Sequence, residues 1–299
     1  MDTFLPAHPQ PLSPSAPCRE ATIVDTHCHL DDPVFRDSLE AVVGENVRNG
    51  VRWMLAAGTT RASSRMAVEI ARKFPSVFAA VGIQPTCVLD EIREIGGDDD
   101  YSLDIQEKLL REIEELSRGE KKVVALGETG LDDYWKNVPM PIQVEFLKGH
   151  LALGRKLDLP VIIHCRDSEM EILRVAEAEF AENGLIRGVI HSFSSDRFFL
   201  EKCLELGLSI SYSGSVTYKN KKYDALRATV PHVPAGRLLI ETDSPYLIPT
   251  QARKTLKVNQ PWAARYTAEV LAEMRGVAVE EILRQTAENA ESLFRVSVP

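Results

Sequence analysis

Short apolar runs alternate with longer amphipathic segments along most of the chain. The short runs are rich in valine, isoleucine and leucine and often end at a glycine or a polar residue, which predicts β-strands. These predicted strands cover residues 22–27, 52–57, 77–82, 123–127, 160–164, 188–191, 209–213 and 238–241. The longer segments have apolar residues three or four positions apart, which predicts helices. They cover residues 35–49, 62–73, 103–117, 141–157, 169–183, 196–206, 221–229, 261–275 and 279–294.

The predicted strands are apolar along nearly their whole length. This pattern is typical of a parallel sheet whose faces are covered by helices. Eight strand–helix units within about 275 residues predict an α/β fold, a (β/α)8 TIM barrel, with an extra C-terminal helix at 279–294. An open doubly wound sheet is the alternative arrangement. No linker rich in proline, glycine or serine divides the middle, so we expect one domain over residues 21–299.

The first 20 residues contain five prolines and have neither the basic start nor the apolar block of a signal peptide. We expect residues 1–20 to form a disordered arm outside the domain. No apolar run reaches the roughly 18 residues that a membrane helix needs. The five cysteines are widely spaced and form no CxxC pair, which indicates a reducing compartment. The sequence therefore predicts a cytoplasmic protein without a membrane partner.

Polar side chains occur repeatedly at the C-terminal ends of the predicted strands. The candidates are His27 and His29 at the first strand, Glu128 at the fourth, His164 at the fifth, His191 at the sixth and Asp243 at the eighth. In a TIM barrel these ends converge on one mouth, where active sites lie. Imidazole and carboxylate are common ligands of Zn²⁺, Mn²⁺ and related ions. Four histidines and two carboxylates exceed one tetrahedral site, so the pattern predicts two divalent ions that share a bridging carboxylate.

Each of these residues, taken alone, has an ordinary structural explanation. A histidine at a strand end is often only hydrogen-bonded, and Glu128 could cap a helix or join an ion pair. Asp243 could cap a helix before the Ser-Pro that follows it. The agreement of five strand ends favours the metal centre. We interpret the remaining histidines, His8, His150 and His232, as incidental to it.

The net charge of −9 argues against indiscriminate binding of polyanions. The acidic residues concentrate in 90–120, whereas 219–222 and 253–257 are basic and follow the seventh and eighth predicted strands. Lys219 and Lys221 would therefore line the rim of the barrel mouth, where they either guide a nucleic acid or are simply solvated.

Aromatic residues also lie on the loops predicted at the mouth. Tyr134, Trp135 and Tyr218 could stack on nucleobases there. Packing within the loops is an equally good explanation of these three side chains.

Five motifs resemble the TatD family of metal-dependent deoxyribonucleases, which belongs to the amidohydrolase-type TIM barrels. They are VDTHCHLD at 24–31, GETGLD at 127–132, HCR at 164–166, HSF at 191–193 and ETDSPYL at 241–247. Each motif is moderately specific, and their order and spacing together are highly specific. The resemblance covers about residues 21–296, which is nearly everything except the arm.

The resemblance implies a ligand set for two metals. By their places in the motifs, His27 and His29 match the ligands of the first metal, and His164 and His191 match those of the second. Glu128 matches the carboxylate that bridges the two metals.

The resemblance also implies residues that act on the substrate. Asp243 matches the carboxylate that binds the first metal and takes the proton of the attacking water, so Asp243 and Glu128 are the expected catalytic residues. Arg166 is expected to contact a phosphate oxygen. Gln84 stands where the family usually has a histidine near the phosphate, and it can donate a hydrogen bond but carry no charge. Gln260 stands where the family commonly has a glutamate, which is a milder departure.

Three functions compete at this stage. The first is a deoxyribonuclease of the 3′–5′ exonuclease type that acts on a DNA end or single strand with Zn²⁺, Mn²⁺ or Mg²⁺. The second is a metal-dependent esterase or deacylase that acts on aminoacyl-tRNA or another small ester or amide. Glu128 on the fourth strand, in place of the modified lysine of many amidases, favours the TatD type. The third is a barrel with structural metals, which ranks last because structural sites are usually closed and rich in cysteine.

Overall fold

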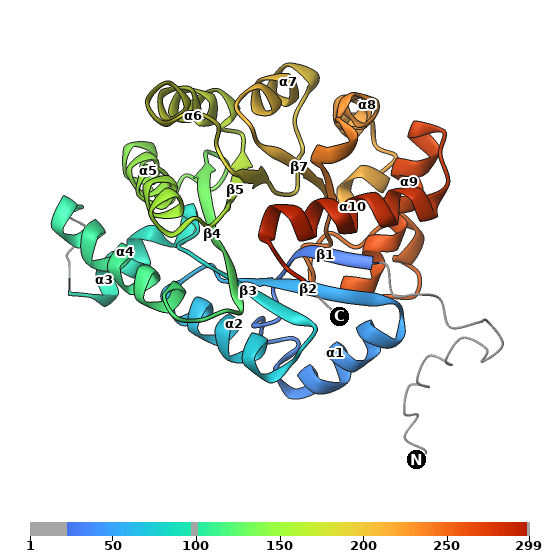
Figure 1. The fold of residues 1–299 in the computed structure, drawn as a ribbon, viewed down its shortest axis with the longest axis horizontal. Coiled ribbons are helices and arrows are strands. Elements are labelled where there is room, and N and C mark those ends of the chain that lie inside the picture. Colours follow the sequence, from blue (N-terminus) through green and yellow to red (C-terminus); the bar gives the residue numbers. More distant parts are fainter. Residues whose placement is uncertain (1–22, 97–100, 298–299) are drawn as a thin grey trace, which may run out of the picture.

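The computed structural model describes residues 23–96 and 101–297. Within them, eight parallel strands form one sheet in which neighbours follow the order of the chain from β1 to β8 (Figure 1). The strands are β1 Ile23–Cys28, β2 Val51–Ala57, β3 Val77–Val81, β4 Val123–Asp132, β5 Val161–Arg166, β6 Gly188–Ile190, β7 Ser209–Tyr212 and β8 Leu238–Ile240. This order confirms the TIM barrel and excludes the doubly wound alternative, in which the strand order reverses. The arm predicted at 1–20 lies outside the described residues.

The barrel closes where β1 meets the segment that follows β8. Cys28 and Ser244 form a parallel bridge, and the His29 backbone N–H donates to the Ser244 carbonyl at 2.7 Å. The Asp243 N–H donates to the His27 carbonyl at 2.9 Å. The buried Asp25 carboxylate accepts the Thr242 N–H at 2.9 Å, and it also accepts the Thr242 hydroxyl. This seam brings His27 of β1 and His29, which follows β1, beside Asp243.

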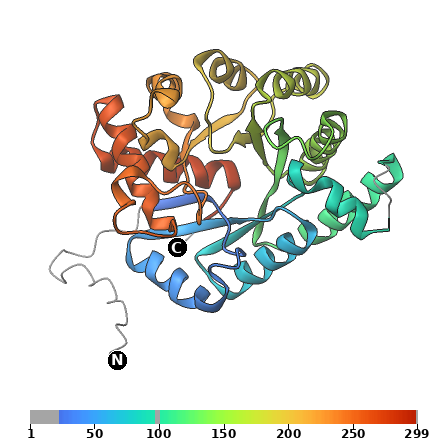
Figure 2. The ribbon, with the colours of Figure 1, turned by 180° about the vertical axis from the view of Figure 1, so that it is seen from behind.

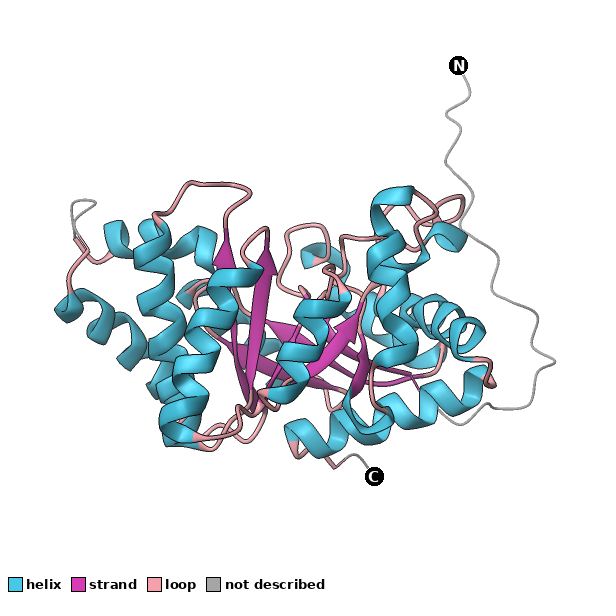
Figure 3. Cartoon of the chain, turned by 90° about the horizontal axis from the view of Figure 1, so that it is seen from above, coloured by secondary structure: helices cyan, strands magenta, loops and turns pink. Residues whose placement is uncertain are grey.

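Helices surround the sheet in the described part of the chain (Figures 1 and 3). They are α1 Leu39–Arg48, α2 Arg61–Lys73, α3 Val88–Glu94, α4 Leu103–Ser117, α5 Met140–Leu157, α6 Glu169–Asn183, α7 Arg197–Glu205, α8 Asp224–Thr229, α9 Ala264–Arg275 and α10 Val279–Phe294. The main apolar core lies between these helices and the outer face of the strands. Among the described residues, no helix combines the length and the apolar character needed to cross a bilayer.

The extra C-terminal helix α10 closes the N-terminal end of the barrel. Figure 1 shows it across the middle of the strands, and Figure 2 shows the opposite side. Its residues pack with the inward-facing side chains of the strands in a second, inner core, where the Trp53 and Phe294 rings meet edge to face with centroids 6.2 Å apart. The Asn289 side chain donates to the Leu238 carbonyl at 2.8 Å. The inner core therefore leaves only the C-terminal end of the barrel for chemistry.

One predicted strand ended too early, and one short helix was not predicted. The fourth strand continues five residues past its predicted end at 127, because Gly130 and Asp132 still pair with β5 at His164 and Arg166. The short helix α3 was not predicted. Its apolar residues are few and are mixed with acidic ones, so the helical period is weak over seven residues.

Candidate metal centre

The six predicted ligands converge at the C-terminal end of the barrel, with Glu128 at the centre. Its Oε2 lies 3.4 Å from His27 Nε2. Its Oε1 lies 2.9 Å from His164 Nδ1 and 3.1 Å from His191 Nε2. The Glu128 side chain is only 4% exposed, so these histidines take the place of water around it.

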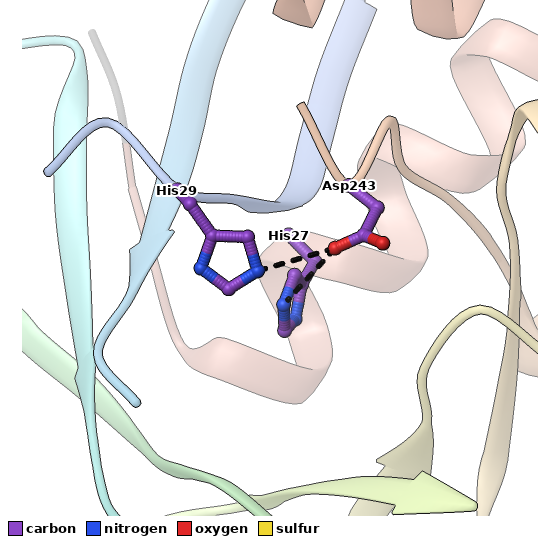
Figure 4. A group of neighbouring side chains, drawn as sticks. All are labelled: His27, His29 and Asp243. Carbon is purple, nitrogen blue, oxygen red and sulfur yellow. Dashed lines mark ion pairs between the residues drawn. The ribbon is translucent and has the colours of Figure 1, made fainter. Parts of the chain in front are cut away.

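A second carboxylate faces the two histidines at the C-terminal end of β1, His27 and His29 (Figure 4). Asp243 Oδ1 lies 3.2 Å from His29 Nε2 and 3.7 Å from His27 Nε2. Two sets of ligand atoms are close enough to share a cation: His27, His29 and Asp243 form one, and His27, Glu128 and His191 form the other. His164 adjoins the second set, with its Nδ1 3.3 Å from His191 Nε2.

Three of the histidines are oriented by a partner on the far side of the ring. His29 Nδ1 lies 3.1 Å from the Ala57 carbonyl. His164 Nε2 lies 3.0 Å from Asp132 Oδ2, and His191 Nδ1 lies 3.3 Å from Glu241 Oε1. Such an acceptor holds the proton on its side and leaves the other nitrogen free to bind a metal.

Asp132 and Glu241 were not among the predicted site residues, although both stand inside the quoted motifs. Each is an acidic residue a few positions from a predicted ligand, and this is the signal that the sequence carries. The histidine that each one orients comes from a different strand, so the pairing emerges only from the fold.

His27 is the member that best fits a bound cation. Its ring is completely buried, and neither ring nitrogen has a hydrogen-bond partner among the described residues. A buried polar group without a partner is costly. A metal ion on Nε2, which faces both carboxylates, would remove the part of that cost that falls on Nε2, so the donor set fits a divalent cation.

In this cluster the carboxylate of Glu128 is stabilised in its ionised form, and the ring of His29 is stabilised in its protonated form. Burial opposes ionisation of Glu128, but the charge of His191 and the hydrogen bonds of His164 and His191 hold the pKa of Glu128 well below its usual range. Burial likewise lowers the pKa of His29, but the hydrogen bond and charge of Asp243 outweigh it and raise that pKa to about 9. A cation entering this cluster therefore meets two anionic carboxylates and competes with protons for the imidazoles.

The predicted substrate contacts lie in two places on the rim. Arg166 is exposed at the end of β5, and its guanidinium lies 3.9 Å from the centre of the Tyr134 ring. Lys219 and Lys221 are exposed after β7. They follow Tyr218, and the Arg253 guanidinium lies 4.3 Å from the centre of the Tyr218 ring.

Both glutamines that depart from the family pattern have local partners. The Gln84 side-chain oxygen accepts the Thr86 N–H at 3.1 Å, and it also accepts the Thr86 hydroxyl. Gln84 thus caps the turn Pro85–Cys87. The Gln260 oxygen accepts from Asn46 Nδ2 at 3.3 Å, which ties its loop to α1.

Residues 24–295 match the family described as TatD related DNase. The chain belongs to the TatD family. It is 34% identical over 275 residues to the uncharacterized metal-dependent hydrolase YabD of Bacillus subtilis, covering 92% of this chain and 100% of that one. It is 32% identical over 274 residues to the 3′-5′ ssDNA/RNA exonuclease TatD of Pantoea ananatis, covering 90% and 98%.

The solved structures agree with this assignment. The crystal structure of YJJV, a TatD homolog from Escherichia coli K12, superposes with a TM-score of 0.79 at 27% identity and covers 93% of this chain and 99% of that one. This TatD-family chain is therefore a metal-dependent hydrolase on a TIM barrel.

Proposed function

We propose that this hydrolase is a deoxyribonuclease that trims a DNA end or a single strand from 3′ to 5′ with two divalent cations. One observation carries the proposal: the Glu128 carboxylate lies between two groups of ligand atoms, with Oε2 toward His27 and Oε1 toward His164 and His191. A carboxylate shared in this way suits a pair of cations. The ions, Zn²⁺, Mn²⁺ or Mg²⁺, would lower the pKa of water and offset the charge of a phosphodiester.

Asp243 is suited to accept a proton from the attacking water. Burial raises the pKa of this carboxyl, but the hydrogen bond and charge of His29 outweigh it and hold that pKa below its usual range, so Asp243 is ionised at neutral pH. Its side chain is 17% exposed, so water can reach it. In the proposed reaction the water oxygen bonds to phosphorus while the bond from phosphorus to the leaving sugar oxygen breaks. Asp243 takes the water proton, and the leaving sugar oxygen takes up a proton from solvent and becomes a hydroxyl.

Charge on the rim supports a nucleic acid as the substrate. Arg166, Lys219 and Lys221 are exposed there, although the whole chain carries a net charge of −9. Locally positive loops on a negative protein would guide a strand end inward without holding long duplexes tightly. The name of the Pantoea ananatis relative, a 3′-5′ ssDNA/RNA exonuclease, supports the direction and the single strand.

The test is cleavage of end-labelled single-stranded DNA by protein that has been stripped of metal and re-supplied separately with Mg²⁺, Mn²⁺ or Zn²⁺. We expect shortening from the 3′ end with at least one ion. Asp243→Asn and Glu128→Ala should each lower the rate about a hundredfold or more, because they remove the base and the shared carboxylate. Asp224→Asn, at an exposed carboxylate on α8, is the matched control and should cleave like the wild type.

The competing substrates are an aminoacyl-tRNA ester and simpler model esters, and both belong in the same assay. Hydrolysis of these esters by a protein that binds metal but leaves DNA intact would overturn the nuclease proposal and favour the deacylase.

A further inference from the structure

Two large aromatic side chains are exposed beside the metal centre. Tyr134 is 51% exposed and Trp135 is 62% exposed, and their rings meet edge to face with centroids 5.0 Å apart. Side chains of this size are usually covered, and exposed apolar groups beside a site often mark a surface that binds something. Both residues follow β4, the strand that carries Glu128.

The side chains of these aromatics are exposed, but the backbone that carries them is firmly held. Asp132 Oδ1 accepts the backbone N–H groups of Tyr134 at 3.0 Å and Trp135 at 2.9 Å. Gln143 on α5 accepts the Asp132 N–H at 2.7 Å and donates to the Asp132 carbonyl at 3.0 Å. A platform whose backbone is fixed in this way loses less conformational freedom when it binds a flat ligand.

Arg166 adds a cation to this platform. Its guanidinium lies over Tyr134 and is 5.6 Å from the centre of the Trp135 ring. Stacking on an aromatic ring orients a guanidinium while its N–H groups remain able to bind phosphate. A flat aromatic surface beside a cation matches a nucleotide, which carries a flat base and an anionic phosphate.

The carboxylate that holds the platform also holds the metal centre. The second oxygen of Asp132 lies 3.0 Å from His164 Nε2, and the Asp132 side chain is 1% exposed. One buried group therefore fixes both the stacking surface and a predicted metal ligand, so the distance between them is set by a single side chain.

We propose that Tyr134, Trp135 and Arg166 form a nucleobase-binding subsite and that Asp132 sets its position relative to the metal centre. The inference rests on the proposed function, because it identifies the part of a nucleic acid strand that the rim recognises. Asp132 is a positioning residue in this scheme. It touches neither the base nor the phosphate, and it acts through the platform backbone and His164.

The first test measures how much binding depends on bases. The metal-loaded protein is titrated with two fluorescent hexamers that resist hydrolysis through phosphorothioate linkages, one of thymidine and one without bases, and anisotropy is followed. We expect the thymidine hexamer to bind more tightly. Trp135→Ala should weaken it about fivefold or more while leaving the abasic hexamer unchanged, since stacking carries that difference. Tyr134→Ala should weaken the thymidine hexamer to a similar extent, and because the Tyr134 ring also orients the Arg166 guanidinium, it should weaken the abasic hexamer as well.

Two further variants assign the effect to the ring faces. Trp135→Phe keeps an aromatic face and should retain most of the affinity for the thymidine hexamer. Phe180→Ala removes an exposed aromatic from the C-terminal part of α6 and should bind like the wild type. Equal affinity for both hexamers, or unchanged affinity in Trp135→Ala and Tyr134→Ala, would overturn the subsite.

The second test examines Asp132 through metal affinity rather than activity. In Asp132→Asn the oxygen can still accept the two backbone N–H groups, so the new amide N–H must face His164 Nε2. That N–H donates to Nε2 and drives the His164 proton onto Nδ1, the nitrogen that faces Glu128. We expect Zn²⁺ affinity to fall about tenfold or more, as for lost partners of metal ligands, with binding of the thymidine hexamer in EDTA unchanged.

Asp132→Ala removes both the acceptor of the two backbone N–H groups and the partner of His164. This variant should therefore lose metal affinity and base-dependent binding together. Wild-type Zn²⁺ affinity in both variants would refute the positioning role. These binding measurements are independent of catalysis. Base-dependent binding without cleavage would support the subsite and overturn the nuclease proposal. Cleavage with equal binding of both hexamers would support the nuclease proposal and overturn the subsite.

Discussion

Replacing His150 with leucine is expected to change how the stability of the fold depends on pH. His150 lies on α5 and is completely buried. Its Nε2 accepts the Ile83 N–H at 3.2 Å, and its Nδ1 donates to the Phe146 carbonyl at 2.8 Å. Nδ1 also lies 3.2 Å from the Thr129 hydroxyl, next to Glu128. The neutral ring thus connects the segment that follows β3 to the C-terminal half of β4.

Burial lowers the pKa of His150 from 6.5 to about 4. The unfolded chain therefore takes up a proton near pH 6.5, where the folded chain does not, and the wild type loses stability as the pH falls from 6.5 toward 4. From these two values, the loss between pH 7.5 and pH 5 is about 2 kcal/mol. Above pH 6.5 the ring is neutral in both states and contributes no slope.

The assay is urea unfolding in EDTA at several pH values for the wild type and for His150→Leu. At pH 7.5 the variant should be less stable by about 1–3 kcal/mol, because the Ile83 N–H loses its acceptor. As the pH falls to 5, the two free energies of unfolding should converge by about 2 kcal/mol. His232→Leu, at an exposed histidine, should show no convergence with the wild type. A difference for His150→Leu that stays constant over this range would refute the assignment of a buried neutral ring.

Two other predictions concern the metal centre and the inner core. Because the pKa of His29 is about 9 in the metal-free site, apparent Zn²⁺ affinity should fall about tenfold per pH unit between pH 9 and 7 for each proton displaced; a chelator competition titration that gives a flat profile would contradict this. Phe294→Ala should cost about 3–5 kcal/mol by opening a cavity against Trp53. Urea unfolding beside the exposed Phe180→Ala would show whether α10 contributes this much.

Much of the fold follows from the sequence because the strands are buried on both faces. Val161 to Ile163 is a run of three apolar residues, and each is buried in the barrel. The same logic failed at the end of β4, because Glu128 and Asp132 are polar and yet belong to the strand. Glu128 lies where the pairing of β4 with β5 is irregular, and Asp132 still pairs with β5 opposite Arg166, while both side chains serve the mouth.

The convergence of the six candidate ligands was predictable from the sequence, but their network of partners was not. The spacing of His27 and His29 and the positions of the other strand ends suffice to bring six side chains to one end of a barrel. The partner of each ring depends on the register between neighbouring strands. Asp132 reaches His164 because β4 and β5 pair with Gly130 opposite His164. His150, predicted to be incidental, stays outside the ligand cluster, and the structure gives it a supporting role behind β3 and β4.

Because α10 covers the N-terminal end of the barrel, the metal centre can be reached only from the C-terminal end. The inner core runs from the strands to Ala287, Ala290 and Phe294 without a break, so no strand of nucleic acid can thread through. Exposure at the centre is confined to the other end, where His29, His164 and Asp243 are 12%, 15% and 17% exposed. Whatever is hydrolysed must enter and leave by the same opening, so a free end is the simplest part of a polymer to present there.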